Sequence, residues 1–290
     1  MPVISREEWR VSYHWSRSSG LKLGPCDYQG ERVLRDASVP FVYVNYAGDA
    51  SGPFTDELKS ESTAIEVREI MFGFDLKVSY DHYGPDYQYD HVWRFLHDGQ
   101  FGSKIIVQGP GEEIDGEHVY HVPFRFDVDV SGAASDSFER RSKSGRWSAV
   151  SREGRHEASG KEGVYDWRVI DRGSGKSAEV RAGVGDDAEL WALRYRRAES
   201  WSSFGGTQSG PPGSAGSVPA VYATGESVEQ TDVVLWYIAH VPSGDLPRAC
   251  GPWFDLRGFP PPPDEEDDHH HHDDEGDHNH DDQEGGHHHH

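Results

Sequence analysis

The stretch Glu117 to Gly132 reads EHVYHVPFRFDVDVSG and constrains the fold more than any other part of the chain. Apolar and charged residues alternate from Phe124 to Val130, which is the period-two pattern of a half-buried β-strand. Two imidazoles, His118 and His121, precede this alternation. Histidines at one end of a strand and carboxylates on its opposite pleat are typical of a metal-bearing element. An ordinary sheet strand with a polar solvent face has the same pattern, so the spacing alone leaves both interpretations open.

The composition favours strands and turns over helices. The chain holds 9 Trp, 13 Tyr, 12 Phe and 33 Gly, but only 2 Met. No apolar run approaches the roughly 20 residues that cross a bilayer, and the first residues lack the apolar core of an export signal. Cys26 and Cys250 are the only cysteines, and a reduced pair is the simpler interpretation. We therefore expect a cytoplasmic protein that does not enter a membrane.

The net charge of −23 comes largely from one end of the chain. Residues 264–290 contain 12 of the 51 acidic residues and neither lysine nor arginine. The rest of the chain therefore carries 39 acidic against 28 basic residues, a net charge of −11. Either value repels a phosphate backbone, so we expect no nucleic-acid partner.

Strand patterns recur along residues 1–260. Residues 86–108 predict a β-hairpin that turns at Asp98-Gly99. The polar residues 131–163 predict either a pair of solvated strands or a mobile loop. Further segments with strand patterns are 5–46, 65–83, 164–171, 188–198, 231–241 and 252–259. The run 231–241, TDVVLWYIAHV, is the most apolar of these and predicts a buried strand.

The segment from Asp86 to Gly99 resembles the catalytic domain of the copper amine oxidases. That family carries a pattern close to Asn-Tyr-(Asp/Glu)-Tyr, then a Trp, then an aromatic residue followed by Asp-Gly. The matching positions are Asp86, Tyr87, Gln88, Tyr89, Trp93, Phe95, Asp98 and Gly99. Other segments follow the family in order over most of residues 1–260. The resemblance implies an all-β fold, a β-sandwich of the amine oxidase catalytic-domain type, in which Tyr87 is the precursor of topaquinone.

The resemblance also implies a copper site. The family has His-X-His, an Arg five residues later, and then Asp-X-Asp. Counting back from Arg125 places His118 on the first histidine and Tyr120 on the second, and His121 lies one position late. We predict that a β-bulge turns His121 into the site. His118, His121 and His240 would then bind copper, for which imidazole is a suitable ligand. Tyr120 is the alternative second ligand, or it blocks the site.

A second metal site, for calcium or manganese, is implied by the same resemblance. Its donors would be the carboxylates of Asp127, Asp129 and Asp232 and the carbonyls of Val128 and Val233. These are hard oxygen donors that suit such cations. We expect this site to be structural, because it would link two strands that are distant in sequence.

The resemblance implies a reaction as well. Asp56, in GPFTDEL, would be the catalytic base that removes a proton from the substrate carbon. Tyr89 would orient the quinone ring. A primary amine would be converted to an aldehyde, with O2 consumed and hydrogen peroxide and ammonia released. The family's dimers imply a homodimer here.

Residues 261–290 differ from the rest of the chain. They carry 10 of the 18 His residues among 12 carboxylates, which predicts a disordered tail that captures metal ions, with a merely solubilising tail as the alternative. Three functions remain open at this point. The chain is a copper- and quinone-dependent amine oxidase, a non-catalytic copper-binding or metal-sequestering protein, or a copper oxidase that acts on another substrate such as a peptide.

Overall fold

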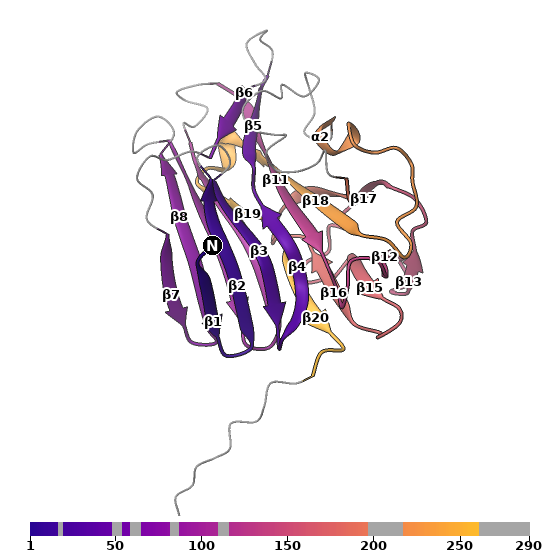
Figure 1. Cartoon of the computed structure of the whole chain (residues 1–290). Helices are drawn as coiled ribbons and strands as arrows, with labels where there is room; N and C mark the ends of the chain where they lie inside the picture. The colour runs from indigo at the N-terminus through magenta and orange to yellow at the C-terminus, as the bar shows by residue number, and fades with distance from the viewer. Residues whose placement is uncertain are drawn as a thin grey trace, which may run out of the picture.

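The computed structural model describes residues 1–16, 20–47, 54–58, 65–81, 87–109, 116–196 and 217–260. In these residues the chain forms two large antiparallel sheets, A and B (Figure 1). Sheet A is ordered β1-β2-β3-β4-β11-β18-β17-β14, and β5 pairs with both β11 and β6. Its strands are β1 (Val3–Arg6), β2 (Trp9–Ser16), β3 (Gly20–Tyr28), β4 (Glu31–Ser38), β5 (Phe41–Tyr46), β6 (Phe54–Glu57), β11 (His118–Val128), β14 (Gly154–Glu157), β17 (Asp187–Arg194) and β18 (Val233–Pro242).

Sheet B is ordered β13-β12-β15-β16-β20-β10-β9-β8-β7, and β19 pairs with β10. Its strands are β7 (Glu66–Ile70), β8 (Gly73–Asp81), β9 (Gln88–Leu96), β10 (Gln100–Gln108), β12 (Asp136–Arg141), β13 (Trp147–Ala149), β15 (Trp167–Asp171), β16 (Ser177–Arg181), β19 (Arg248–Cys250) and β20 (Trp253–Arg257). Two one-turn helices, α2 (Ser217–Ala220) and η3 (Ser243–Asp245), accompany the strands in the described part of the chain.

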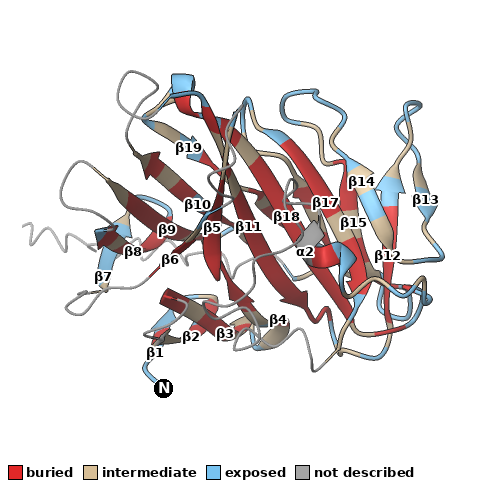
Figure 2. Ribbon diagram, turned by 90° about the horizontal axis from the view of Figure 1, so that it is seen from above, coloured by how far each residue is buried: buried red, intermediate tan, exposed pale blue. Residues whose placement is uncertain are grey.

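The main core lies between the two sheets. Alternate residues of each strand point into it, as the period of two requires. Phe126 of sheet A packs against Trp93 and Phe254 of sheet B, with ring centroids 5.8 and 4.6 Å away. Figure 2 shows the buried segments concentrated on the central strands, while the outlying β7, β13 and β14 are largely exposed. The predicted β-sandwich is confirmed.

The centre of sheet A is covered on its other face too. A second apolar cluster there contains Phe41, Tyr43, Leu193, Val234 and Trp236. Partly buried side chains of the segment that follows α2 pack against this cluster. A strand covered on both faces has apolar residues at every position. This explains the unbroken apolar run that forms β18.

Several local predictions are confirmed, and one is wrong. β9 and β10 pair as a hairpin around Asp98-Gly99, and both cysteines are free and buried. The polar residues 131–163, for which the sequence predicts a pair of solvated strands or a mobile loop, instead supply three strands, β12, β13 and β14, and β12 is largely buried. The bulge expected to re-aim His121 is absent, because the pairing of β11 with β18 runs without a shift from Val119 to Val128. The irregularity in β11 lies at Asp127/Val128, opposite β4.

Two remaining expectations concern the ends and the environment of the chain. No helix among the described residues is long and apolar enough to cross a membrane. The predicted tail, residues 261–290, lies outside the described residues, as does Asp86.

Candidate functional site

The paired strands β11 and β18 carry the predicted histidines on opposite faces of sheet A. His118 and Tyr120 are two residues apart and point into the main core, with exposed fractions of 1% and 0%. His121 is three residues from His118, so the pleat of an unbroken strand turns it to the outer face. His240 is the partner of His121 in the ladder and lies on that outer face as well. The three imidazoles therefore do not converge.

His118 is held in one orientation on the inner face. Its Nδ1 lies 2.7 Å from the Gly116 carbonyl oxygen, which can only accept, so Nδ1 carries the proton. In the neutral ring Nε2 is then an acceptor, and the Tyr120 hydroxyl, 2.9 Å away, donates to it. The ring of Tyr46 stacks on His118 with centroids 4.7 Å apart. Nε2 of His118, the nitrogen that would bind a metal, is thus already hydrogen-bonded to the Tyr120 hydroxyl.

Asp56 joins the two tyrosines of β9. Its Oδ2 accepts hydrogen bonds from the Tyr87 hydroxyl, at 2.6 Å, and from the Tyr89 hydroxyl. The two phenol oxygens are themselves 3.3 Å apart. Asp56 belongs to β6, which pairs with β5, so the short strand brings this carboxylate to the end of β9. The structure thus places the predicted base beside the predicted quinone precursor.

The tyrosine cluster is closely packed and keeps its protons. Burial, followed by the Asp56 charge, raises the pKa of both Tyr87 and Tyr89. The ring centroid of Tyr120 lies 6.4 Å from that of each of these tyrosines. Gly109 completes the wall, since a Cβ there would lie 2.2 Å from the Tyr120 hydroxyl. Phenol, carboxylate and imidazole side chains therefore form one group on the inner face, in which Tyr87 is partly buried and the others are buried.

This inner group does not fit the predicted copper centre. Of the three predicted histidines only His118 faces it, and its Nε2 is bonded to Tyr120. The position opposite Tyr120 on β18 is Val241, which is 1% exposed and offers no ligand atom. The structure does not bring His118, His121 and His240 together in one site, because β11 stays in register and the rings of His121 and His240 face outward.

The outer face instead brings two imidazoles together. The Nδ1 atoms of His121 and His240 are 2.7 Å apart, and the ring centroids are 4.9 Å apart. Two nitrogens that bind one ion at about 2.0–2.1 Å lie roughly 2.9 Å apart when they are neighbours in a square plane. The spacing therefore suits a shared ion, provided that the rings turn so that both Nδ1 lone pairs point at the ion rather than at each other. The amide of Asn45 lies 3.2 Å from Nε2 of His121 and supports that ring from behind.

The histidine pair borders a cavity of about 610 Å³. Its wall includes three carboxylates and one guanidinium, those of Glu157, Asp187, Glu189 and Arg155. Asp187 is the ladder neighbour of His240 on β17. Burial lowers the pKa of His121 to about 3, with a further contribution from His240, and burial also lowers the pKa of His240. Both rings are therefore neutral at pH 7, the form in which imidazole binds a metal.

The predicted oxygen donors of the calcium or manganese site lie farther along β11. Asp127 is fully buried, and neither of its carboxylate oxygens has a hydrogen-bond partner. Asp129 and Asp232 each have one carboxylate oxygen that is also buried without a hydrogen-bond partner. Burial raises the pKa of Asp127 to about 8 and also raises the pKa of Asp129 and Asp232. Val128 and Val233, whose carbonyls complete the predicted set, are partners in the ladder.

These acids suit a hard cation by chemistry, but they are not gathered tightly. Arg125 approaches Asp127 at 3.7 Å and Arg35 approaches Asp232 at 3.4 Å, so two guanidinium groups share the charge. Within the described ranges, the oxygens of Asp127, Asp129 and Asp232 are not among the sets of three donors that all lie within 4.8 Å of one another. Binding of one ion by all three would require the carboxylates to move inward.

The sequence did not reveal several residues of these groups. Asp136 is a further acid near this group and is fully buried, and burial and the nearby Asp129 raise its pKa to about 8. Tyr46 covers His118, and Val241 occupies the inner position opposite Tyr120. Each of these residues becomes evident only when strands distant in sequence are paired. The alternation of side chains along β18 does, however, predict from sequence alone that Val241 and His240 lie on opposite faces.

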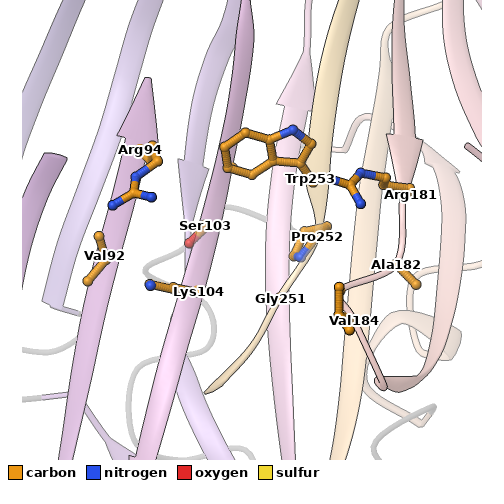
Figure 3. Close-up of a pocket in the computed structure, with 12 residues that line it drawn as sticks. Val92, Arg94, Ser103, Lys104, Arg181, Ala182, Val184, Gly251, Pro252 and Trp253 are labelled. Atoms are coloured by element: carbon orange, nitrogen blue, oxygen red, sulfur yellow. The ribbon is translucent and has the colours of Figure 1, made fainter. Parts of the chain in front are cut away.

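A further hollow of about 200 Å³ lies on the outer face of sheet B. Figure 3 shows Arg94, Lys104 and Arg181 around it, with the Trp253 ring between them. Arg94 is engaged by Asp75 through two bonds of 2.7 Å. None of the residues predicted from the sequence as a catalytic or metal-binding residue lines this hollow.

Comparison with known proteins identifies the fold. No protein-family model matches the chain, and no curated protein matches its sequence. The amine oxidase of Aspergillus nidulans has a similar structure, with a TM-score of 0.63 at 14% identity. The lysyl oxidase of Pichia pastoris gives 0.62 at 11%, and the copper-containing benzylamine oxidase of Hansenula polymorpha gives 0.61 at 14%. Each match covers 89% of this chain but only 52%, 52% and 60% of those proteins, so the chain spans little more than half their length. The chain has an amine-oxidase-like β-sandwich fold.

Proposed function

We propose that this chain is a non-catalytic metal-binding protein built on the amine oxidase fold, which binds Cu²⁺ at His121 and His240. The observation that carries the proposal is the 2.7 Å contact between the Nδ1 atoms of these residues on the outer face of sheet A. Tyr87, the predicted quinone precursor, belongs to the buried group on the opposite face. The proposed copper site and the tyrosine cluster thus lie on opposite faces of sheet A.

The histidine pair has the properties that a copper ligand needs. Imidazole suits Cu(II), which also accepts water or carboxylate in a tetragonal arrangement. Because the two Nδ1 atoms are hydrogen-bonded, one of them carries a proton, and binding of one ion by both Nδ1 atoms would require that ring to adopt the tautomer with its proton on Nε2. Two protein nitrogens and a solvent-filled cavity would hold the ion more weakly than a closed three-histidine site. This is a suitable arrangement for capture and release.

The amine oxidase remains the second candidate, because Asp56 contacts Tyr87 directly. In that alternative, copper and the quinone would supply the redox chemistry, with O2 and a primary amine, or another substrate such as a peptide, as reactants. Asp56 would accept the substrate proton, and Tyr89 would orient the neighbouring ring. The obstacle is the donor set, since Tyr120 and Val241 occupy the positions where two histidines would be needed.

The sequence of residues 261–290 supports the same function. Its 10 histidines among 12 carboxylates would bind Cu²⁺ without a fixed geometry. We include this tail in the proposal as an additional capture segment. Its contribution is measured by deleting it and counting the bound copper. A capture role predicts a fall in stoichiometry, and an unchanged count would contradict it.

The two candidate functions differ in whether a quinone forms. Metal-free protein is loaded with Cu²⁺ in air and then treated with phenylhydrazine, which labels a quinone. We expect no coloured adduct, while the protein retains Cu²⁺. A coloured adduct that is lost in Tyr87→Phe but kept in Tyr89→Phe would overturn the non-catalytic proposal and establish the oxidase.

We also propose that Ca²⁺ or Mn²⁺ binds at Asp127, Asp129 and Asp232, because a cation would satisfy their buried, unpartnered oxygens. Either ion should then raise the melting temperature of the wild type. Asp129→Ala should abolish this rise, whereas Glu162→Gln, at an exposed acid elsewhere, should preserve it. An equal rise in Asp129→Ala would exclude the site.

A further inference from the structure

A compact set of metal donors lies at one edge of the sandwich, away from both faces of the β11–β18 pair. In the described part of the chain, the one set of three or more histidine, cysteine or carboxylate donors that all lie within 4.8 Å of one another is Glu7, Glu8 and His97. The two glutamates form the turn between β1 and β2 of sheet A. His97 follows β9 in sheet B. The set therefore spans the two sheets.

The donor distances are close to those of a metal site. Nδ1 of His97 is 2.6 Å from Oε2 of Glu7 and 3.4 Å from Oε2 of Glu8. Donors about 2.0–2.1 Å from a tetrahedral ion are roughly 3.3 Å apart, so the Glu8 distance already fits. The Glu7 side chain is 60% exposed and is free to move outward by the remaining fraction of an ångström.

Glu8 distinguishes this set from an ordinary surface ion pair. Its side chain is only 10% exposed, and its Oε2 is buried without a hydrogen-bond partner while it faces His97. A carboxylate oxygen in this condition has lost its hydration and has only the His97 ring, 3.4 Å away, to compensate for that loss. A cation placed between Glu8 and His97 would restore the lost interaction.

The backbone segments that carry these donors are already held in place by hydrogen bonds between them. The Trp9 indole donates to the Leu96 carbonyl at 2.7 Å, and the Tyr28 hydroxyl donates to the His97 carbonyl at 2.9 Å. The Gln29 amide donates to the Glu8 carbonyl at 2.7 Å. The turn of sheet A and the hairpin end of sheet B are therefore already tied together. A site held on such elements needs little reorganisation to bind.

We propose that Glu7, Glu8 and His97 form a Zn²⁺-class site that clips sheet A to sheet B. One imidazole and two carboxylates are a borderline donor set that favours Zn²⁺ over Ca²⁺ and Mg²⁺, which prefer all-oxygen sites. Water would complete the tetrahedron. The ion binds the folded arrangement of two segments about ninety residues apart, so it stabilises the contact between them.

Hydrogen exchange of the full chain tests this site locally, so that ions bound elsewhere do not interfere. Exchange is followed by mass spectrometry with and without ZnCl2 in peptides that cover residues 1–12 and 92–101. Both peptides should exchange about tenfold more slowly when free Zn²⁺ is about ten times its dissociation constant, because the protection factor is 1 + [L]/Kd. CaCl2 at the same concentration should have no such effect.

Two variants and a control complete the test. Glu7→Gln keeps the fold because its side chain is exposed, and His97→Gln removes the imidazole. Both should lose the Zn²⁺-dependent slowing. Glu69→Gln, which removes a neighbouring surface acid paired with Arg6, should retain it. No slowing in the wild type, equal slowing by Ca²⁺, or slowing that persists in Glu7→Gln and His97→Gln would each overturn the proposal.

Discussion

The two faces of the β11–β18 pair carry different side chains, because adjacent residues along each strand point to opposite faces. On the inner face, His118 is bonded to Tyr120, and Val241 fills the position opposite that tyrosine. On the outer face, His121 and His240 are directly opposite each other in the same ladder. The fold thus has a tyrosine and carboxylate cluster, with His118, on one side and the paired imidazoles of His121 and His240 on the other. A shared β-sandwich does not by itself specify a shared metal centre.

The largest expected effect comes from moving imidazoles to the inner face. The double variant Tyr120→His with Val241→His adds two inward imidazoles beside His118, because these positions are ladder partners. We expect at least one additional Cu²⁺ per chain with nitrogen hyperfine splitting in electron paramagnetic resonance. Tyr120→His alone, the matched control, should add less. No additional copper in a folded double variant would contradict the assignment of faces.

A second prediction uses His91, an imidazole inside the core. It is 0% exposed, it lies 2.9 Å from the Ser103 hydroxyl, and burial lowers its pKa to about 3. The unfolded chain, with a pKa near 6.5, binds this proton first as the pH falls. The free energy of unfolding should therefore decrease from about pH 6.5 down to about pH 3.

The contribution of His91 is isolated by denaturant titration of the wild type and His91→Gln across this range. The difference in unfolding free energy between the two proteins should change by roughly 3–5 kcal/mol from pH 7 to pH 3. A difference that stays constant with pH would show that the core does not keep this imidazole neutral.

A smaller effect is expected at Asp56. Asp56→Ala leaves the hydroxyls of Tyr87 and Tyr89 without the carboxylate that accepts from both. Loss of a buried hydrogen-bond acceptor costs about 1–3 kcal/mol, and the two hydroxyls keep their contact with each other, so we expect a loss of roughly 1–3 kcal/mol in the free energy of unfolding. Tyr87→Phe, which removes one donor and leaves Tyr89 bonded, should cost less. Equal stability of Asp56→Ala and the wild type would contradict the inner cluster.

The strands could be predicted well from the sequence, because the alternation of apolar and polar residues indicates which side chains of a strand are buried. β11 begins at His118, and the apolar run 231–241 becomes the doubly covered β18. The hairpin at Asp98-Gly99 follows from local turn chemistry. These features depend on neighbouring residues, so a single sequence contains enough information to identify them.

The arrangement of the candidate metal ligands was less predictable, because it depends on which face of a strand each residue occupies and on which strands pair. The three-residue separation of His118 and His121 already indicates opposite faces in a regular strand, and the expected bulge does not occur there. The contact of Asp56 with Tyr87 was anticipated only through the family resemblance. Asp136 and the Glu8–His97 approach required the packed structure, because their partners come from distant strands.

A crystal of the full chain soaked in Cu²⁺ tests the central claim most directly. Anomalous scattering at the copper edge locates the ion without interference from other bound metal. We predict a peak between the Nδ1 atoms of His121 and His240 and none beside Tyr87 and His118. A peak in the inner cluster, with none at the outer histidine pair, would contradict this account.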